Sequence, residues 1–174
     1  LFFFLYCFLG WVWESCYVSV KSRKPVNRGF INGPFCTIYG FGAVSVYLIL
    51  KNFDQDLLVL YIGGVVVATV LEFITGWLME TIFHTRWWDY SDLRFQIQGR
   101  VCLVGLVIFG IGGLLLVYRL APAASRLLKR IPPKTLEILC LVLILLFAAD
   151  FCHSIFRPNM GDGIPTALTG TLRP

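Results

Sequence analysis

The sequence predicts an all-α fold: a polytopic integral membrane helix bundle with about five hydrophobic segments. Hydrophobic residues make up 57% of the 174 residues and charged residues 14%, whereas a typical soluble domain has roughly 45–50% apolar and about 25% charged residues. The mean hydropathy is +0.76. The few charges gather in short stretches between long apolar runs, as in loops that connect membrane spans.

Five apolar stretches approach the roughly 20 helical residues that a bilayer core requires. Transmembrane β-strands are excluded, because no run of about 9–11 residues alternates in polarity. The first stretch has no basic leader or small-residue cleavage site, so we expect a retained span and not a signal peptide. The second is short, so it either spans the membrane or re-enters it. The stretches are residues 1–20, 35–50, 57–83, 101–118 and 136–156.

The domain organisation follows from these stretches. We expect one transmembrane helical domain over residues 1–156 and a polar tail, rich in Gly, Pro and Thr, over residues 157–174. If the second stretch spans, the first and third loops with the tail hold nine Lys or Arg, against six on the other side. If it re-enters, the division is ten against five. Both counts place the loop at residues 21–34 in the cytoplasm and leave the two topologies open.

Apart from Glu137 at the start of the fifth stretch, four acidic side chains lie within the apolar stretches: Glu14, Glu72, Glu80 and Asp150. A charged side chain at the bilayer centre costs about 3 kcal/mol on insertion scales. These carboxyl groups must therefore be protonated, paired, near an interface or facing a wet cavity. Glu72 lies near the middle of its stretch, where a side chain cannot easily reach the headgroups, so it is the main candidate for a functional acid. Scaffolding between helices is the alternative.

Spacing adds detail to this prediction. Glu72, Gly76 and Glu80 are four residues apart, so they share one helix face, where the glycine allows a neighbouring backbone to approach. Asp150 and His153 are three residues apart and share a face, which allows a proton relay or a hydrogen bond that only joins helices. With two His and no Cys or Glu at ligand spacing, we expect no metal site and no cofactor.

Two loops combine polar and aromatic residues. Residues 26–42 hold Asn27, Arg28 and Asn32 among four glycines, and Arg28 either grips a carboxylate or phosphate or meets lipid headgroups. Residues 83–92 contain aromatic side chains that suit the headgroup layer. The interleaved Asp89 and Asp92 are not explained by such an aromatic belt.

These stretches, read as NRGFINGPFCTIYGFGA, LEFITGWLMETIFHTRWWDYS and QGRVCL, resemble the bacterial membrane family called ABC-transporter type IV, or CmpB-like permease. The similarity extends from about Leu1 to Gly110, with departures at Thr37 and Gln96. The resemblance implies a multi-pass protein of the bacterial cytoplasmic membrane. Its signature implies a substrate site formed by Glu14, Asn27, Arg28, Asn32, Tyr39, Glu72, Glu80, Trp88, Asp89, Tyr90 and Arg100.

Three functions remain open at this stage. The resemblance implies a transport component for a polar solute, with membrane lipids, a separate ATPase subunit and a homo- or hetero-oligomeric assembly as partners. The residues contain no GxxxxGK[ST] motif, so this chain is not expected to hydrolyse ATP by itself. The alternatives are an intramembrane enzyme acting on a lipid-linked or phospholipid substrate, and a scaffold or regulatory subunit. Basic loops are explained by the membrane, so we expect no nucleic-acid partner.

Overall fold

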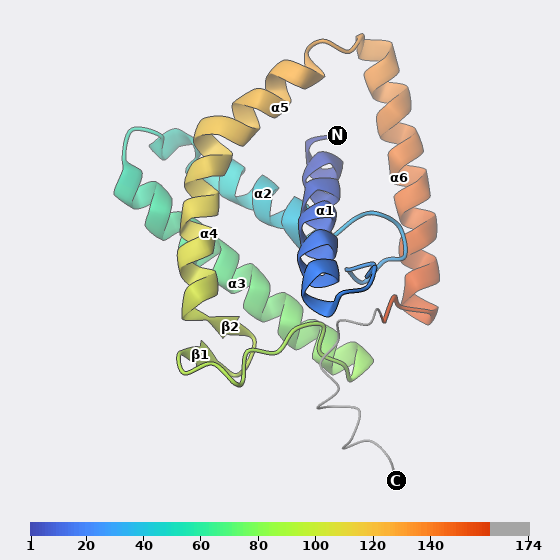
Figure 1. Ribbon diagram of the computed structural model, residues 1–174. Helices are drawn as coiled ribbons and strands as arrows, with labels where there is room; N and C mark the ends of the chain where they lie inside the picture. Colours follow the sequence, from blue (N-terminus) through green and yellow to red (C-terminus); the bar gives the residue numbers. More distant parts are fainter. Residues whose placement is uncertain (161–174) are drawn as a thin grey trace.

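The computed structural model describes residues 1–160 and consists of helices apart from one small hairpin (Figure 1). This arrangement confirms the predicted all-α membrane bundle. The part of the expected tail at residues 161–174 lies outside the described residues. The helices are α1 (Phe2–Ser22), α2 (Thr37–Leu50), α3 (Leu57–Phe83), α4 (Leu103–Leu115), α5 (Ala121–Leu128) and α6 (Pro133–Phe156), with a 3-10 turn η1 (Lys51–Phe53), a π-helical segment η2 (Leu116–Leu120) and strands β1 (Gln96–Ile97) and β2 (Val101–Cys102).

Four helical stretches in the described part of the chain are long and apolar enough to cross a membrane: α1, α3, Leu103–Leu128 and α6. The helix α2 has 14 residues, which is about 21 Å of helix and too short for a core about 30 Å thick. By itself, α2 therefore does not reach across such a core, and spanning would require further backbone beside it.

The irregular segment Val26–Cys36 precedes α2 and returns along α1. Three backbone N–H groups of this segment donate to α1, at positions progressively nearer its start. Val26 donates to Ser19 Oγ at 2.9 Å, Arg28 to Ser15 Oγ at 3.2 Å, and Cys36 to the Cys7 carbonyl at 2.9 Å. Irregular backbone at membrane depth requires such partners within the protein. The segment therefore enters the bundle beside α1 and continues into α2.

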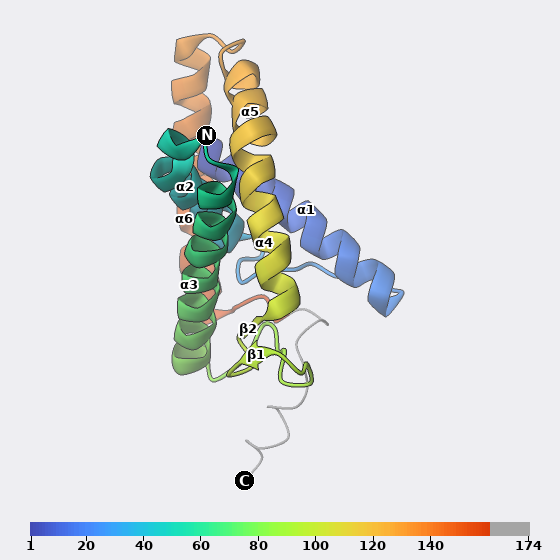
Figure 2. The same ribbon diagram turned by 90° about the vertical axis from the view of Figure 1, so that its left-hand side faces the viewer.

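The helix α2 then runs antiparallel to α1. The ring of Tyr47, near the end of α2, lies 5.5 Å from that of Phe2 at the start of α1. The second loop therefore lies at the opposite end of the bundle from the first. Figure 2 shows the far end of α1 diverging from α3 and α4, which leaves room for the returning segment. The spanning alternative for the second stretch stays a prediction, because α2 is not one of the four helical stretches long enough to cross a membrane.

The core lies where α2, α3 and η2 meet, around the buried Val46, Leu60 and Leu116. The helices α3 and α4 approach closely because Gly64 faces Gly113: a Cβ added at Gly113 would lie 3.2 Å from the Gly64 Cα. Small residues at such crossings allow backbones to pack in membranes. The helix α6 stands to one side (Figure 1) and contacts α1 through aromatic rings, with Phe147 5.7 Å from Phe4.

The predicted fourth stretch, residues 101–118, has different bounds in the structure. Val101 and Cys102 form β2, and the helix continues beyond Tyr118 through η2 and α5 to Leu128. Ala, Leu and Arg are strong helix formers, so the charges that suggested a loop do not end the helix. The π-helical turn η2 precedes Pro122, and a proline is tolerated in the first turn of a helical segment.

Candidate functional site

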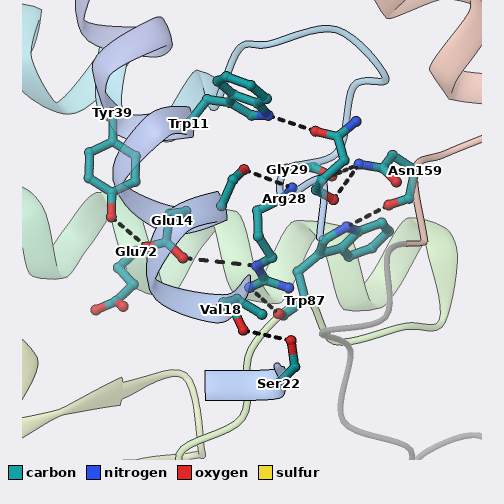
Figure 3. A network of polar contacts seen from close by, with 12 residues as sticks. Trp11, Glu14, Val18, Ser22, Arg28, Gly29, Tyr39, Glu72, Trp87 and Asn159 are labelled. Carbon is teal, nitrogen blue, oxygen red and sulfur yellow. Dashed lines mark hydrogen bonds and ion pairs between the residues drawn. The ribbon is translucent and has the colours of Figure 1, made fainter. Parts of the chain in front are cut away.

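Glu14, Arg28 and Tyr39 meet in the interior although they come from three elements. Glu14 lies on α1, Arg28 in the irregular segment and Tyr39 near the start of α2 (Figure 3). The Tyr39 hydroxyl donates a hydrogen bond of 2.5 Å to Glu14 Oε1, and Arg28 Nε lies 3.9 Å from Glu14 Oε2. The carboxylate of Glu14 is therefore paired inside the bundle.

Gly10 makes this contact possible. It lies one turn before Glu14 on α1, and a Cβ at Gly10 would overlap the ring of Tyr39. The missing side chain lets the ring lie flat against α1, which brings the hydroxyl to Glu14. The Gly-x-x-x-Glu spacing was visible in the sequence, but the aromatic partner comes from α2.

Arg28 is largely buried, with 11% of its side chain exposed. Besides Glu14, it donates through Nη2 to the backbone carbonyl of Trp87 at 2.9 Å. This bond joins the first loop to the loop after α3, so two of the predicted motifs lie side by side. Arg28 thus contacts a carboxylate and a carbonyl within the protein.

Glu72, on α3, is 5% exposed. Its Oε1 accepts a hydrogen bond of 3.3 Å from the Tyr90 hydroxyl, whereas its buried Oε2 has no hydrogen-bond partner among residues 1–160. Oε2 faces Gly105, in the first turn of α4, at 4.0 Å from the position of an added Cβ. Glu14 is near enough to Glu72 to interact with it electrostatically.

A second polar network lies where α3 ends. Glu80 accepts from Arg100 Nη2 at 2.6 Å and pairs with Arg86 Nη2 at 3.0 Å, and Arg86 Nη1 also lies 3.4 Å from Asp89. The Trp88 indole N–H donates to the Arg100 carbonyl at 2.9 Å. These residues form what we call the loop network: Glu80, Arg86, Trp88, Asp89 and Arg100.

Gly76 creates the space beside this network. A Cβ at Gly76 would lie 3.3 Å from the Trp88 ring and 3.4 Å from the Arg100 side chain. The glycine between the two glutamates of α3 therefore faces an aromatic and a basic side chain. The sequence predicted close approach at this position, and the approaching groups are side chains.

Two ionisable groups of the loop network have perturbed pKa values. Burial raises the pKa of Asp89, but hydrogen bonds from Ser91 and the charge of Arg86 outweigh it, so its pKa lies below the usual range. The hydrogen bond to Glu80 raises the pKa of Arg86, with burial acting in the opposite direction. Both pKa shifts favour the charged forms of Asp89 and Arg86, which form an ion pair.

Three predicted site residues hold the first loop in place. The Trp11 indole donates to Asn27 Oδ1 at 2.6 Å, and Asn27 Nδ2 donates to the Asn32 carbonyl at 2.8 Å. Asp150 accepts the backbone N–H of Gly33 at 2.7 Å. These contacts tie the loop to α1 and α6.

The Asp150–His153 relay stays a prediction. The described hydrogen bonds of Asp150 are with the first loop and Ser154, and His153 is exposed on α6. Asn32 Nδ2 donates to Ser154 Oγ at 3.0 Å. Within the described chain, this corner of the structure therefore connects α6 to the first loop.

Sequence reasoning missed several residues of these networks. Asn159, placed in the polar tail, donates to the carbonyls of Asn27 at 2.9 Å and Gly29 at 3.2 Å, and it accepts from the Trp87 indole at 3.2 Å (Figure 3). Arg86 stands directly before Trp87 and Trp88 in the sequence, and this position next to the aromatic residues was the signal that could have identified it. No local pattern around Asn159 indicates its partners, which lie about 130 residues earlier.

The predicted site residues therefore separate into an inner site, the loop network and a loop clamp. The inner site is closest to what an intramembrane binding site requires, because its polar groups come from α1, the first loop, α2, α3 and the third loop. The inner site consists of Glu14, Arg28, Tyr39, Glu72 and Tyr90; the loop clamp consists of Asn27, Asn32 and Asp150.

A helix bundle with long apolar helices and charged groups between them defines a polytopic membrane protein. The chain belongs to the family described as "Putative ABC-transporter type IV", whose family model matches residues 1–155. The match extends beyond the predicted Leu1–Gly110 through most of α6. No curated protein and no solved structure matches the chain. The family name associates the protein with ABC transporters and so with other transporter subunits.

Proposed function

We propose that this protein is a permease-like membrane component of a transport system and that the inner site binds the polar solute as it crosses the membrane. The observation on which the proposal rests is the buried Glu72 Oε2, which lacks a partner within the described residues. Leaving a buried polar atom unsatisfied costs free energy. An acid without a partner inside a membrane helix bundle is a candidate site for binding a ligand or a proton.

The position of Glu72 supports this role. It lies on a helix long enough to span the membrane and next to the paired Glu14. Residues from separate elements that converge on one acid can change its surroundings when the elements move. A solute in this position would contact α1, α2 and α3.

ATP hydrolysis is assigned to a separate subunit in this proposal. The 174 residues contain no GxxxxGK[ST] motif, whose glycine-rich loop holds nucleotide phosphates. The family association with ABC transporters supports a partner that supplies this activity. We also propose that the assembly is a homo- or hetero-oligomer in the bacterial cytoplasmic membrane.

An intramembrane enzyme acting on a lipid-linked substrate is the second candidate. The Arg28–Trp87 bond favours it, because it brings two loops with basic and acidic residues to the same end of the bundle. However, Arg28 faces Glu14, while Arg86 and Arg100 pair with Glu80. Arginines already paired with carboxylates are poorly placed to hold a phosphate, so the transport proposal is preferred.

The experiment has two readouts from native membranes. A tagged chain is purified in mild detergent, and ATP hydrolysis is measured in the eluate. Membrane vesicles are then incubated with cell extract and ATP, and the accumulated compounds are identified by mass spectrometry. We expect a co-purifying ATPase and a compound whose ATP-dependent uptake is lost in E72Q.

The control is E137Q, which changes an exposed acid on α6 and should retain uptake. If no ATPase co-purifies and E72Q vesicles accumulate the same compounds as the wild type, the transport proposal is wrong. Loss of folding in E72Q, tested by size-exclusion chromatography, would favour the scaffold alternative.

A further inference from the structure

We propose that Glu72 is a proton-binding site: Oε2 takes up a proton from water and releases it again as the inner site changes conformation. This inference rests on the proposed function and deepens it, since it names the proton as a ligand of the transport site. It is drawn from the contacts of one carboxyl group.

The two oxygens of Glu72 have different surroundings. Oε1 accepts the Tyr90 hydroxyl, so it is satisfied in either protonation state. Oε2 is buried beside Gly105, and the Cys102 thiol and the Phe109 ring also lie next to that glycine, but neither forms a hydrogen bond with Oε2. Oε1 of the carboxylate thus has a hydrogen-bond donor, whereas Oε2 has none and can bind a proton.

Charge balance also favours a proton. Arg28 lies against Glu14, which makes that pair close to neutral. Glu72 forms no ion pair with any residue in the described part of the chain. Each ionisation of Glu72 therefore leaves one uncompensated negative charge inside an apolar bundle, and each protonation removes it.

The other groups around Glu72 do not replace that counter-charge. Glu14 interacts with it from α1, and the Tyr90 hydroxyl donates to it from the third loop. Gly105 lies beside it at the start of α4, next to the Cys102 thiol of β2. Glu80, two turns further along α3, is engaged by Arg86 and Arg100. The Tyr90 hydrogen bond stabilises an ionised Glu72, whereas the nearby Glu14 repels it, and none of these neighbours of Glu72 carries a positive charge.

A metal ion and an anion fit this position less well. Hard cations such as Ca²⁺ bind six to eight oxygens, whereas the contacts of Glu72 supply the carboxylate and one hydroxyl. Three arginine Nε atoms are also buried without a hydrogen bond, but each belongs to a guanidinium that already faces a carboxylate. The group without a counter-charge is an acid, so the ligand is positively charged.

The step requires no other reactant. A hydronium ion reaching the site transfers its proton to Oε2, an O–H bond forms, one O–H bond of the hydronium breaks, and a water molecule remains. Release of the proton is the reverse step: Oε2 transfers the proton back to a water molecule after the inner site has changed conformation. The carboxyl group changes from charge −1 to neutral, and the total charge is conserved.

Infrared difference spectroscopy tests this proposal on the purified full chain in detergent. A protonated carboxyl group has a C=O stretching band that an ionised one lacks. We expect a band that disappears reversibly as pH rises in the wild type and in the control E137Q, and that is missing in E72Q. Gln retains the size of Glu and can accept the Tyr90 hydrogen bond, so E72Q should fold.

Three results would overturn the proposal: no titrating band in the wild type, the same band in E72Q, or a Glu72 band that does not change with pH. Far-UV circular dichroism and size-exclusion chromatography establish that E72Q is folded. The readout does not depend on transport. A titrating Glu72 band, combined with no co-purifying ATPase and unchanged accumulation in E72Q vesicles, would reject the transport proposal alone. A co-purifying ATPase and uptake that is lost in E72Q, without a titrating Glu72 band, would reject proton binding alone.

Discussion

Arg28 donates to the backbone carbonyl of Trp87 at 2.9 Å, and this bond joins two loops that lie 59 residues apart in the sequence. The same guanidinium faces Glu14 on α1. One side chain therefore fixes the first loop, the third loop and α1 relative to one another. Because the inner site is built from these elements, its geometry depends on Arg28.

Removal of this arginine should be destabilising. Leaving a buried acceptor without its donor costs about 1–3 kcal/mol. Loss of Arg28 removes the donor of the Trp87 carbonyl and the counter-charge of Glu14, which lies 3.9 Å away and is partly exposed. We expect R28A to lower the free energy of unfolding in detergent by an amount near that range, and R126A, at an exposed arginine of α5, to change it little. If R28A is as stable as R126A, the Arg28 contacts are not structural. The double variant E14Q/R28Q should lose less than the sum of the single variants.

A glycine pair tests the packing of Tyr39. In G10A, the new methyl group would displace the Tyr39 ring, so we expect lower stability and a weaker Tyr39–Glu14 contact. In G42A, the added Cβ meets nothing within 4 Å, so the better helix propensity of alanine should stabilise α2 by up to about 1 kcal/mol. Thermal unfolding of the two variants should move in opposite directions. A shift of the same sign and size would contradict the arrangement.

The third loop should loosen in acid. The pKa of Asp89 is lowered in the folded protein, so its stabilising contribution is present above its unfolded pKa of about 3.9 and is lost as pH falls through the lower folded value. We expect proteolysis of residues 84–102 to increase over that acidic window in the wild type. In D89N the loop should be more sensitive at neutral pH and lack this transition. D92N, at an exposed carboxylate, should behave like the wild type.

Asn159 should protect the first loop from hydrogen exchange. Its side chain donates to two carbonyls there, and each such bond contributes about 0.5–1.5 kcal/mol net. In N159A, the amides around Gly29 and Phe30 should exchange roughly ten-fold faster, since about 1.4 kcal/mol corresponds to a factor of ten. M160A, at an exposed neighbour, is the control. Equal exchange in both variants would show that the Asn159 hydrogen bonds do not hold the loop.

The antiparallel α1–α2 arrangement predicts which loops share a side of the membrane. Single cysteines at Lys21 and Asp92 should react with a membrane-impermeant thiol reagent from the same side, and a cysteine at Lys129 from the other. The background replaces the exposed Cys16 and Cys152 and the half-buried Cys36 and Cys140 by Ser. From the Lys and Arg count, we expect Lys21 and Asp92 to be cytoplasmic. Labelling of Lys21 and Lys129 positions from one side would exclude the arrangement.

Much of the fold was predictable because apolar segments of sufficient length have few alternatives in a membrane. The helix at Leu57–Phe83 has the predicted bounds. The helical stretch that ends at Leu128 is longer than predicted. Arg119 and Arg126 suggested a loop, but basic side chains are tolerated near the end of a span. The irregular path of residues 26–36 could not be predicted from the sequence either, because its hydrogen-bond partners are Ser15, Ser19 and the Cys7 carbonyl on α1.

The sequence by itself determined that acids such as Glu14, Glu72 and Glu80 lie in membrane helices, because composition and segment length dictate burial in lipid or protein. The tertiary structure decided which of them are paired. Arg28 reaches Glu14 and Arg100 reaches Glu80 only because loops fold back along the helices, whereas no cation among the described residues reaches Glu72. Ion pairs act over a few ångströms, and such proximity between distant residues is set by the packing of the whole chain.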